Sequence, residues 1–306
     1  MRGDEAGEKL EGCSNLNKGV GLRTKRIFTT TLAAAALTGA ACLTGMTGTA
    51  SAAVAGIPAA DNIAHPGGPI VTASGSGSTT VSLNWSGYAV TSKKLFTYVH
   101  TTFVQPAITC TGQPDQWTSN WSGLDGYNSD TVEQDGTFAH CGGTGNTTPK
   151  YQAWYELFPA ASVNVFAVHP GDIIDSSVSY STTTSMFTLT ISDLSTGKSS
   201  STTAACASCA RTSAEWIVER PELCNNAGTN CFLTQLADYG TSTMSGDEAQ
   251  LTGGNIKGVG GFNNIPIDMV DPVSGGGFIS LDTVGAVSAK SFTATWDRSG
   301  NIFPIT

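Results

Sequence analysis

Residues 213–220 read SAEWIVER, a run in which apolar and charged side chains alternate. In a β-strand, successive side chains point to opposite faces of the sheet. Ala214 and Trp216 then share an apolar face, and Glu215 and Glu219 lie on the other face with an isoleucine between them. The alternation predicts a strand. It leaves two interpretations of Glu215 open: a solvated surface charge, or a carboxylate set into a site.

From about residue 81 onward the chain repeats segments of this kind. Short runs rich in Val, Ile, Thr, Tyr, Phe and Trp alternate with clusters of Gly, Asn, Asp and Ser, which is typical of many short strands joined by turns. We find no long amphipathic helix with capping residues. The clearest further strands are VSLNWSGYAV (81–90), FTYVHTTFV (96–104), YQAWYELF (151–158), IIDSSVSY (173–180), MFTLTISDL (186–194) and SFTATW (291–296).

The turn signal STGK follows MFTLTISDL and predicts a hairpin. The region from 81 to 306 has an ordinary length for one β-sandwich. We therefore predict an all-β, single-domain antiparallel β-sandwich of the concanavalin-like or jelly-roll type.

The N-terminal region is typical of a secretory signal peptide. Basic residues at 23–26 precede an apolar stretch of small residues, and Ala50-Ser51-Ala52 supplies small residues for a cleavage site. We predict a signal peptide over residues 1–52, with the real start near Val20 because the first twenty residues are unusually acidic, and a secreted, extracellular protein. A membrane anchor is the weaker alternative. Residues 53–80 are rich in Ala, Gly, Pro, Ser and Thr, and we expect a flexible tail or short propeptide.

The chain that remains after residue 52 is strongly acidic, with 20 Asp plus Glu against 9 Lys plus Arg. Such a surface repels nucleic acid and anionic membranes, so we expect neither as a partner of the mature protein. It also has few bases that would repel one another once its carboxylates are protonated, which favours tolerance of acid, although simple solubility explains the composition equally well. We expect a monomer.

Six cysteines follow the predicted cleavage site, and an even number in a secreted chain indicates disulfides. Six cysteines allow 15 pairings. Of these we expect Cys110–Cys141, Cys206–Cys209 and Cys224–Cys231, the last two as short loop staples. The Cys206-Ala-Ser-Cys209 motif alone could suggest a metal or redox site, but no second CxxC and no closely spaced His accompany it. We expect no metal and no cofactor.

Several catalytic signatures are absent from the sequence. It contains no HExxH, no GxSxG and no Asp-Thr-Gly or Asp-Ser-Gly pair, and no His lies in a recognisable triad context. Polar residues are instead found on aromatic strands. If the segment 130–136 is extended, Gln134 points to one face, and Glu133 and Asp135 point to the other. In YQAWYELF, Trp154 and Glu156 share a face.

These segments, in this order, resemble the glutamic peptidases called eqolisins, family G1. The matching pieces are NWSGYAV, FVQP, WSGLDGYNSDTVEQDGT, YQAWYELFP, HPGD, SAEWIVERP and LADYG, which cover most of residues 84–240. The sequence resembles a bacterial-type member, because fungal members usually carry an aromatic residue where this chain has Leu157. Thr or Ser also commonly follows the catalytic Gln, where this chain has Asp135, which would add a carboxylate beside the site.

The resemblance implies a sandwich of two bent sheets with a concave substrate cleft, and acid-acting cleavage of polypeptides without metal or cofactor. It implies that Gln134 and Glu215 are the catalytic pair. The chemistry is consistent: a carboxylate can activate water and then protonate the leaving amine, and a glutamine amide can hold the oxyanion at any pH. We expect Trp121 and Trp154 to line the cleft, and Asp125 and Glu156 to support the catalytic pair.

Two other functions remain open at this point. A carbohydrate-active jelly roll also uses a concave, Trp-lined face with paired carboxylates, and Glu156 and Glu215 could then be its acid and nucleophile. A secreted sugar-binding or adhesion module would keep the tryptophans and tolerate the loss of Glu215. Gln134 discriminates between these functions, because a glycosidase has no necessary use for it.

Overall fold

The computed structural model describes residues 62–64, 71–74, 79–225 and 230–305. The chain divides into two units, Met1–Ala53 and Val54–Thr306, and every described residue belongs to the second unit. The predicted signal peptide over residues 1–52 therefore lies outside the described residues. In the part of the chain that is described, no helix is long and apolar enough to cross a membrane.

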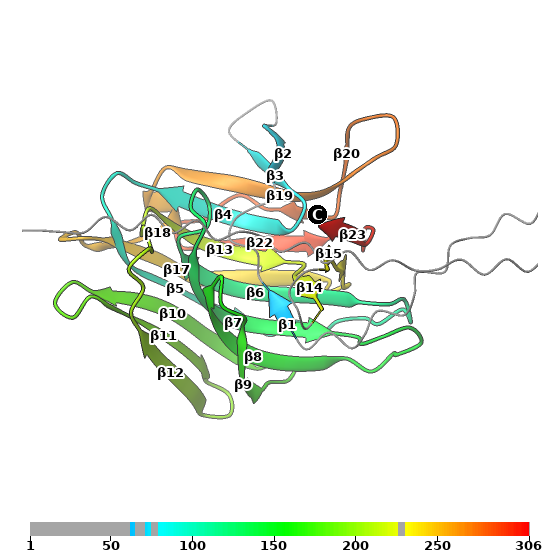
Figure 1. Cartoon of the computed structure of the whole chain (residues 1–306), viewed down its shortest axis with the longest axis horizontal. Coiled ribbons are helices and arrows are strands. Elements are labelled where there is room, and N and C mark those ends of the chain that lie inside the picture. Colours follow the sequence, from blue (N-terminus) through cyan, green and yellow to red (C-terminus); the bar gives the residue numbers. More distant parts are fainter. Residues whose placement is uncertain (1–61, 65–70, 75–78, 226–229, 306) are drawn as a thin grey trace, which may run out of the picture. The chain divides into compact units, whose positions relative to one another are not determined.

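The second unit is built from three β-sheets, and the described part of the chain contains a single helical element, the short 3-10 helix η1 (Val259–Gly261). The largest sheet has eleven strands (Figure 1). In spatial order these are β2 (Val71–Ser74), β3 (Thr80–Ser82), β19 (Asn264–Pro272), β4 (Trp85–Thr91), β13 (Ser213–Glu219), β6 (Gln116–Leu124), β7 (Val132–His140), β8 (Lys150–Phe158) and β9 (Val163–Ala167), with β16 (Gln235–Leu236) on β6 and β20 (Phe278–Ser280) on β19.

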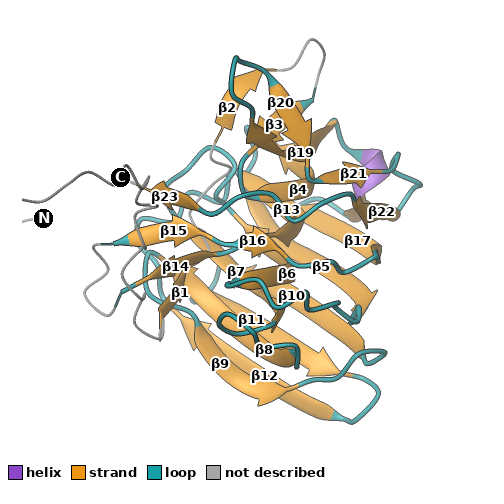
Figure 2. Ribbon diagram, turned by 90° about the vertical axis from the view of Figure 1, so that its right-hand side faces the viewer, coloured by secondary structure: helices purple, strands orange, loops and turns teal. Residues whose placement is uncertain are grey.

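A second sheet of eight strands packs against one face of this sheet (Figure 2). Its order is β12 (Lys198–Ala204), β11 (Met186–Asp193), β10 (Ile173–Ser181), β5 (Phe96–Val104), β17 (Thr241–Leu251), β22 (Ser291–Trp296) and β21 (Asp282–Val284), with β18 (Ile256–Gly258) on β17. A small third sheet of four strands has the order β1 (Asn62–Ala64), β14 (Glu222–Cys224), β15 (Cys231–Leu233) and β23 (Phe303–Ile305).

The predicted all-β sandwich is confirmed. Nearly all strand pairs are antiparallel, and the described exceptions are the short parallel pairs of β3 with β19 and of β6 with β16. The strands expected at 96–104 and 291–296 have the same bounds in the structure, and the expected hairpin joins β11 to β12.

The prediction of one continuous strand over residues 81–90 is wrong, because this segment is divided between β3 and β4. The Ser82 hydroxyl oxygen accepts hydrogen bonds from the backbone N–H groups of Asn84 and Trp85, at 3.2 and 3.0 Å. This local turn competes with sheet pairing and ends β3 before β4 begins. The sequence pattern also missed β17, whose alternation is broken by a bulge at Gly246 and Asp247.

The main hydrophobic core lies between the two large sheets. Trp216 and Leu124 from the eleven-stranded sheet meet Phe103, Ile174 and other side chains of the eight-stranded sheet there, and all of them are buried. Full burial of an apolar side chain of this size stabilises a fold by about 1.5–3 kcal/mol. The indole N–H of Trp216 also donates to the backbone carbonyl of His100 at 2.8 Å and ties the two sheets together.

The other face of the eleven-stranded sheet is buried as well. A second cluster contains Trp85, Trp121, Trp154 and Ile217, and the four-stranded sheet adds Leu223 to it. Strand β13 is therefore buried on both faces along its whole length. This overturns the interpretation of Glu215 as a solvated surface charge.

The segment 53–80, expected to be a tail or propeptide, contains two short described strands. Strand β1 pairs with β14, and β2 pairs with β3 at the edge of the eleven-stranded sheet. These two pieces have sheet structure that the composition did not predict. The assignment of the segment as a propeptide stays a prediction.

All three expected disulfides are present: Cys110–Cys141, Cys206–Cys209 and Cys224–Cys231. The first joins residues 31 positions apart in sequence and is buried at Cys141. The other two span 3 and 7 positions, so they act as the short loop staples that the sequence predicted.

Candidate active site

Four polar or small residues form one row across the eleven-stranded sheet. Glu215 on β13 is paired with Gly123 on β6, Gly123 is paired with Gln134 on β7, and Gln134 is paired with Glu156 on β8. Paired residues in adjacent strands point to the same face, so the side chains of Glu215, Gln134 and Glu156 share a face. Strands lie about 4.8 Å apart, so the backbones of Glu215 and Gln134 are roughly 10 Å apart.

Gly123 keeps the space between Glu215 and Gln134 free of a side chain. A Cβ at this position would lie 3.0 Å from the ring of Trp121, 3.1 Å from Cβ of Gln134 and 3.2 Å from the carbonyl oxygen of Glu133. These distances are too short for ordinary contacts. Glycine at this point of the WSGLDG segment therefore allows two functional side chains to face each other across a strand.

Glu156 holds the amide of Gln134. The Gln134 Nε2 atom donates to Oε2 of Glu156 at 2.7 Å, and both side chains are buried. An amide nitrogen has two N–H donors, so this bond leaves one N–H for another acceptor. The contact fixes the orientation of the amide plane.

Burial raises the pKa of Glu215 well above its usual range, and the negative charges of Asp125 and Glu133 raise that pKa further. Interactions with Ser213 and with the backbone of Tyr127 lower the pKa in part. The side chain is fully buried, and neither carboxylate oxygen has a hydrogen-bond partner of good geometry among the described residues. A carboxyl group in such surroundings keeps its proton to a higher pH than an exposed glutamate does.

The two tryptophans expected in the cleft lie on the same face, in the next row of the sheet. Trp121 pairs with Gly136, and Gly136 pairs with Trp154. Both indoles are fully buried in this structure. The indole N–H of Trp121 donates to Oε2 of Glu219 at 2.7 Å, and the ring of Trp121 meets that of Trp85 edge-on, with 4.9 Å between their centroids.

Asp125 lies just beyond the end of β6 and is fully buried. Its Oδ2 atom accepts a hydrogen bond from the backbone N–H of Arg211 at 2.5 Å, and its Oδ1 atom accepts one from the backbone N–H of Thr212 at 2.8 Å. Its own backbone N–H donates to the carbonyl oxygen of Ser213 at 3.1 Å. Asp125 therefore joins the end of β6 to the segment that leads into β13.

Glu133 and Asp135 point away from this face, as alternation predicts. Asp135 lies between the two large sheets, where its Oδ1 atom accepts from the Ser176 hydroxyl at 2.5 Å. Burial raises its pKa well above the usual range, and the bond from Ser176 opposes that rise. The expectation that Asp135 adds a carboxylate beside the catalytic pair is therefore wrong, since the backbone of β7 separates it from Gln134.

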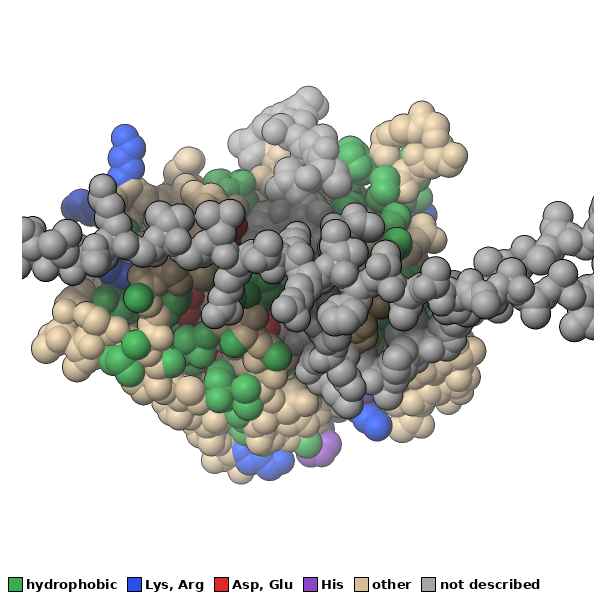
Figure 3. All heavy atoms as spheres, in the orientation of Figure 1, with side chains coloured by type: hydrophobic (Ala, Val, Ile, Leu, Met, Phe, Trp, Pro, Cys, Tyr) green, Lys and Arg blue, Asp and Glu red, His purple; other side chains and the backbone are tan. Residues whose placement is uncertain are grey.

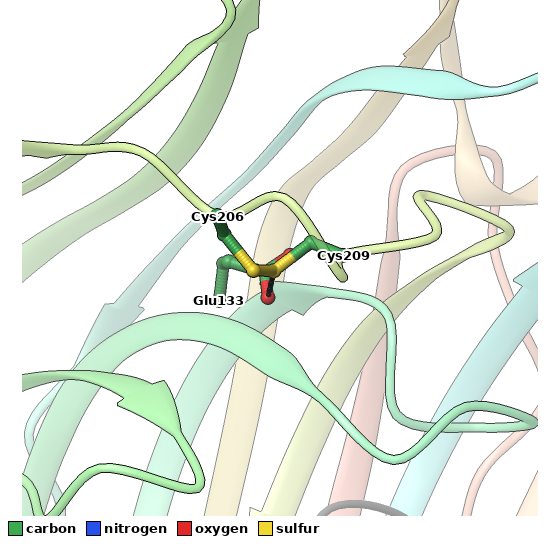
Figure 4. A group of neighbouring side chains, drawn as sticks. All are labelled: Glu133, Cys206 and Cys209. Atoms are coloured by element: carbon green, nitrogen blue, oxygen red, sulfur yellow. Dashed lines mark hydrogen bonds between the residues drawn. A yellow bond between two sulfur atoms is a disulfide. The ribbon is translucent and has the colours of Figure 1, made fainter. Parts of the chain in front are cut away.

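Glu133 contacts the disulfide of the loop before β13 (Figure 4). Its Oε1 atom lies 2.6 Å from Sγ of Cys209, which is bonded to Cys206. A disulfide sulfur carries no proton, so a hydrogen bond between these atoms must be donated by the Glu133 carboxyl group. Burial, together with the charge of Asp125, raises the pKa of Glu133 to about 9, so this carboxyl group is neutral in acid.

Two groups of described side chains have the composition of a metal site. One is Glu133 with Cys206 and Cys209, and the other is Glu222 with Cys224 and Cys231. A cysteine must be a thiolate to bind a metal ion, and all four of these cysteines are oxidised to disulfides. Neither group can act as a thiolate metal site in this state.

On the left half of the surface drawn in Figure 3, hydrophobic side chains surround a few recessed acidic side chains, and the visible Lys and Arg side chains lie toward the margins. A carboxyl group, an amide and indole rings on one sheet face can perform acid–base chemistry on a neutral carbonyl compound. They cannot provide the cationic contacts that phosphate groups need.

The sequence pattern of the Peptidase A4 family matches residues 83–295. The chain belongs to the peptidase A4 family. This peptidase is 29% identical to scytalidopepsin B from Scytalidium lignicola over 192 residues, which are 56% of this chain and 70% of that protein. The resemblance to the eqolisins is thus confirmed at the level of the family. The bacterial-type assignment stays a prediction.

Solved structures show the same fold. Scytalido-glutamic peptidase, crystallised with a peptide-based transition-state analogue, is 22% identical with a TM-score of 0.58, over 70% of this peptidase and 98% of that chain. SCP-B, described as a member of the Eqolisin family in complex with the tripeptide Ala-Ile-His, is also 22% identical, with a TM-score of 0.57 over the same shares.

Sequence reasoning found the polar residues of the row but not their neighbours. It did not single out Gly123, although a glycine opposite two predicted site residues was visible in WSGLDG. It placed Glu219 on the face of Glu215 but gave it no partner, and the structure shows that it holds Trp121. The backbone N–H groups bound by Asp125 could not be found from sequence, because they come from residues more than 80 positions away.

Proposed function

We propose that this peptidase is a secreted, acid-acting endopeptidase in which Glu215 activates the attacking water and Gln134 stabilises the oxyanion. The observation that carries the proposal is the row formed by Glu215, Gly123 and Gln134. It provides a base and a neutral donor on one sheet face, with a space between them in which a peptide carbonyl group can be held.

In the first step, ionised Glu215 takes a proton from water as the water oxygen attacks the carbonyl carbon of the peptide bond. The carbonyl oxygen becomes an oxyanion, and the free N–H of the Gln134 amide donates to it. In the second step, the protonated Glu215 transfers that proton to the leaving nitrogen, and the C–N bond breaks. The carboxylate is restored, so the balance needs no metal and no cofactor.

The electrostatics of the site support a single carboxyl group as the base in the first step and the acid in the second. A group that first accepts and then donates a proton works best when its pKa lies near the working pH. Burial raises the pKa of Glu215 above that of an ordinary glutamate, which makes its carboxylate a stronger base and keeps its protonated form populated to higher pH. Gln134 has no ionisable group, so its donor persists at any acidity.

The alternative of a glycosidase has little support. Glu156 and Glu215 lie three strands apart, and Glu156 is engaged with Gln134. Three strand spacings separate their backbones by roughly 14 Å. Paired glycosidase carboxyl groups lie about 5–9.5 Å apart. Membership of a peptidase family excludes a purely sugar-binding function as the first choice.

The test is digestion of a fluorogenic peptide and of a denatured protein from pH 2 to 8, using mature enzyme and its Glu215→Gln variant. Since Gln is nearly isosteric, the variant should fold, and kcat should fall by about 10²–10⁴-fold. The matched control is Glu248→Gln, on the other large sheet, which should retain activity. Activity should persist in EDTA and in pepstatin. Near-normal turnover by folded Glu215→Gln would refute the proposal, and loss of activity in EDTA would refute metal independence.

A further inference from the structure

Three consecutive residues of β5 contact three consecutive residues of β17 at the point where β17 has its bulge. The register between the strands shifts here, so Gly246 and Asp247 together lie opposite the single residue Thr101. The polar groups of bulge residues need partners outside the regular ladder. Side chains provide these partners, and we call the contacts between residues 100–102 and residues 245–247 the bulge contact.

The ring of His100 joins three strands. Its Nδ1 atom lies 2.9 Å from the carbonyl oxygen of Gly246 on β17, and its Nε2 atom lies 2.8 Å from Oδ2 of Asp175 on β10. The bond from His100 lowers the pKa of Asp175, and the Thr102 hydroxyl donates to the same oxygen at 3.2 Å. A carbonyl oxygen and a carboxylate only accept hydrogen bonds, so both ring nitrogens must donate. The geometry is therefore that of a protonated imidazole.

Glycine at position 246 lets this ring come close to the backbone. Gly246 has a positive φ of 65°, and a Cβ there would lie 3.3 Å from Cε1 of His100. A larger residue would strain the backbone and crowd the ring.

The other two parts of the bulge contact face the core and the ladder. Oδ1 of Asp247 accepts from the Thr101 hydroxyl at 2.7 Å, and its Oδ2 atom has no partner among the described residues. The Ser245 hydroxyl donates to the carbonyl oxygen of Thr102 at 2.9 Å. Asp247 is fully buried, and an ionised carboxylate with one hydrogen bond is costly in such a place. Two of the three parts therefore favour a bound proton.

Charged groups face His100 from the strands on both sides. Asp175 lies on β10, and Glu248 lies on β17, where it pairs with Lys290. On β5 itself, the ring of Tyr98 lies parallel to the imidazole with 6.2 Å between the centroids. The hydrogen bond to Asp175 raises the pKa of His100, burial opposes this rise, and the charge of Glu248 adds to it.

Both protons are lost as the pH rises. The folded-state pKa of His100 lies above its unfolded value, so the stability from its protonated ring is complete below about pH 6.5 and is lost at higher pH. Burial raises the pKa of Asp247 to about 7, and the charge of His100 opposes this rise. Its contribution is complete below about pH 4 and is lost toward pH 7. The bulge contact therefore weakens in two steps.

The bulge contact is connected to the sheet that carries the candidate site. The carbonyl oxygen of His100 accepts from the indole N–H of Trp216, the neighbour of Glu215 on β13. The amide of Asn120 on β6 donates to the Ser242 hydroxyl on β17 at 3.0 Å. Strands β5 and β17 thus support two of the strands that form the catalytic row.

We propose that the bulge contact is an acid-operated lock: protonated His100 and neutral Asp247 hold β17 on β5 in acid, and the loss of both protons loosens the middle of the eight-stranded sheet near neutral pH. The lock concerns the state of the fold, so it goes beyond the proposed function and does not depend on which residues catalyse.

The first experiment observes the ring directly, by nitrogen NMR of the ¹⁵N-labelled mature enzyme from pH 4 to 8. Both ring nitrogens of His100 should carry a proton up to a pH above about 6.5. Asp175→Asn keeps the shape of the partner and removes its charge, and it should lower the midpoint by about one unit. A His100 ring with one protonated nitrogen at pH 6 overturns the inference.

The second experiment measures the Tm of wild type and His100→Gln from pH 5 to 8. An amide can donate to one acceptor at any pH but cannot replace a charged ring. The Tm of His100→Gln should be about 4–8 °C below that of wild type at pH 5, and the difference should disappear at pH 8. The control is His169→Gln, the same substitution at an exposed histidine, which should keep the wild-type Tm. A difference of equal size at pH 5 and pH 8 contradicts the lock.

The third experiment locates the loosening by hydrogen exchange of the wild type. Protection of the backbone N–H groups of β17 should fall between pH 5 and 8 by a larger factor than protection of β7, after correction for the intrinsic rate. Equal changes in both strands overturn the inference. If neither variant folds, this measurement and the wild-type ring spectra decide. None of these measurements uses peptidase activity, so failure of the proposed function, seen as turnover by Glu215→Gln, is separate from failure of the lock.

Discussion

Glu215 and Gln134 lie on either side of Gly123, in register across three neighbouring strands. The glycine has no side chain on the face that these two residues share, and the distances to Trp121 and Gln134 leave no space for one. The space between the proposed base and the proposed oxyanion donor therefore depends on the absence of a side chain at Gly123.

We expect Gly123→Ala to lower peptidase activity by about 10²-fold, because a displacement of about 1 Å in a catalytic group has this effect. Overpacking should also lower the free energy of unfolding by about 1–3 kcal/mol. Kinetics and urea unfolding measure the two effects. Gly143→Ala is the control, since a Cβ there meets no atom within 4 Å. Equal activity of Gly123→Ala and wild type would show that the spacing is unimportant.

Glu156 orients Gln134 through the 2.7 Å contact between Nε2 and Oε2. We expect Glu156→Gln to retain most activity, because its carbonyl oxygen still accepts from the Gln134 amide. Glu156→Leu should lose about 10²–10³-fold, comparable with the removal of an oxyanion donor. The measurement that checks this prediction is kcat of the two variants. If both lose activity equally, the charge of Glu156 is required and an acid–base role must replace the orienting role.

Asp247 should make the free energy of unfolding decrease as the pH rises toward neutral. Its carboxyl group lies at the bulge of β17, where Oδ1 accepts from the Thr101 hydroxyl at 2.7 Å, and burial raises its pKa to about 7. A folded-state pKa above the unfolded value gives stability that is complete below about pH 4 and is lost as pH rises toward 7. The loss for this group is on the order of 4 kcal/mol at higher pH.

We therefore expect Asp247→Asn to raise the Tm above pH 7 by about 8–16 °C and to change it little at pH 4, since each kcal/mol corresponds to roughly 2–4 °C in a domain of this size. Calorimetry across this range provides the measurement. Asp130→Asn, an exposed residue, is the control and should leave the profile unchanged. A Tm difference that is the same at pH 4 and pH 7.5 would contradict the prediction.

The disulfides differ in how much chain they constrain. Removing Cys110–Cys141, which spans 31 positions, should destabilise the fold by about 4 kcal/mol on the chain-entropy model. Removing Cys206–Cys209, which spans 3 positions, should cost about 2 kcal/mol by the same argument. Urea unfolding of the two double Cys→Ser variants measures the difference. The reverse order would show that contacts of the Cys206–Cys209 loop, such as that with Glu133, outweigh loop entropy.

The N-terminal prediction is tested on protein from culture fluid. We expect the mature chain to begin near Ala53, because Ala50-Ser51-Ala52 has the small residues of a cleavage site. N-terminal sequencing measures this directly. A start within 53–80 would indicate propeptide removal, whereas an intact protein beginning at Met1 would refute the signal peptide.

The class of fold could be predicted from the sequence, because alternation in SAEWIVER and similar segments is a local property that pairing in a sheet preserves. It also determined which face of each strand carries Glu215, Gln134, Trp154 and Glu156. The secretory context predicted disulfides, and the short separations of Cys206–Cys209 and Cys224–Cys231 favoured these two pairs. The sequence pattern did not predict the two local interruptions of the strands, the Ser82 turn and the bulge at Gly246.

Which residues meet across strands depends on the tertiary structure. Alternation gives the face of a side chain but not the register between β13, β6 and β7, which come from distant parts of the chain. That register places Gly123 between Glu215 and Gln134, and the packing of the second sheet gives Asp135, on the opposite face, the hydroxyl of Ser176 as its partner. Burial on both faces of β13 was likewise undetermined by the sequence, since a carboxylate in an alternating strand is compatible with water or with a second layer. The second cluster of tryptophans removes that choice and thereby raises the pKa of Glu215.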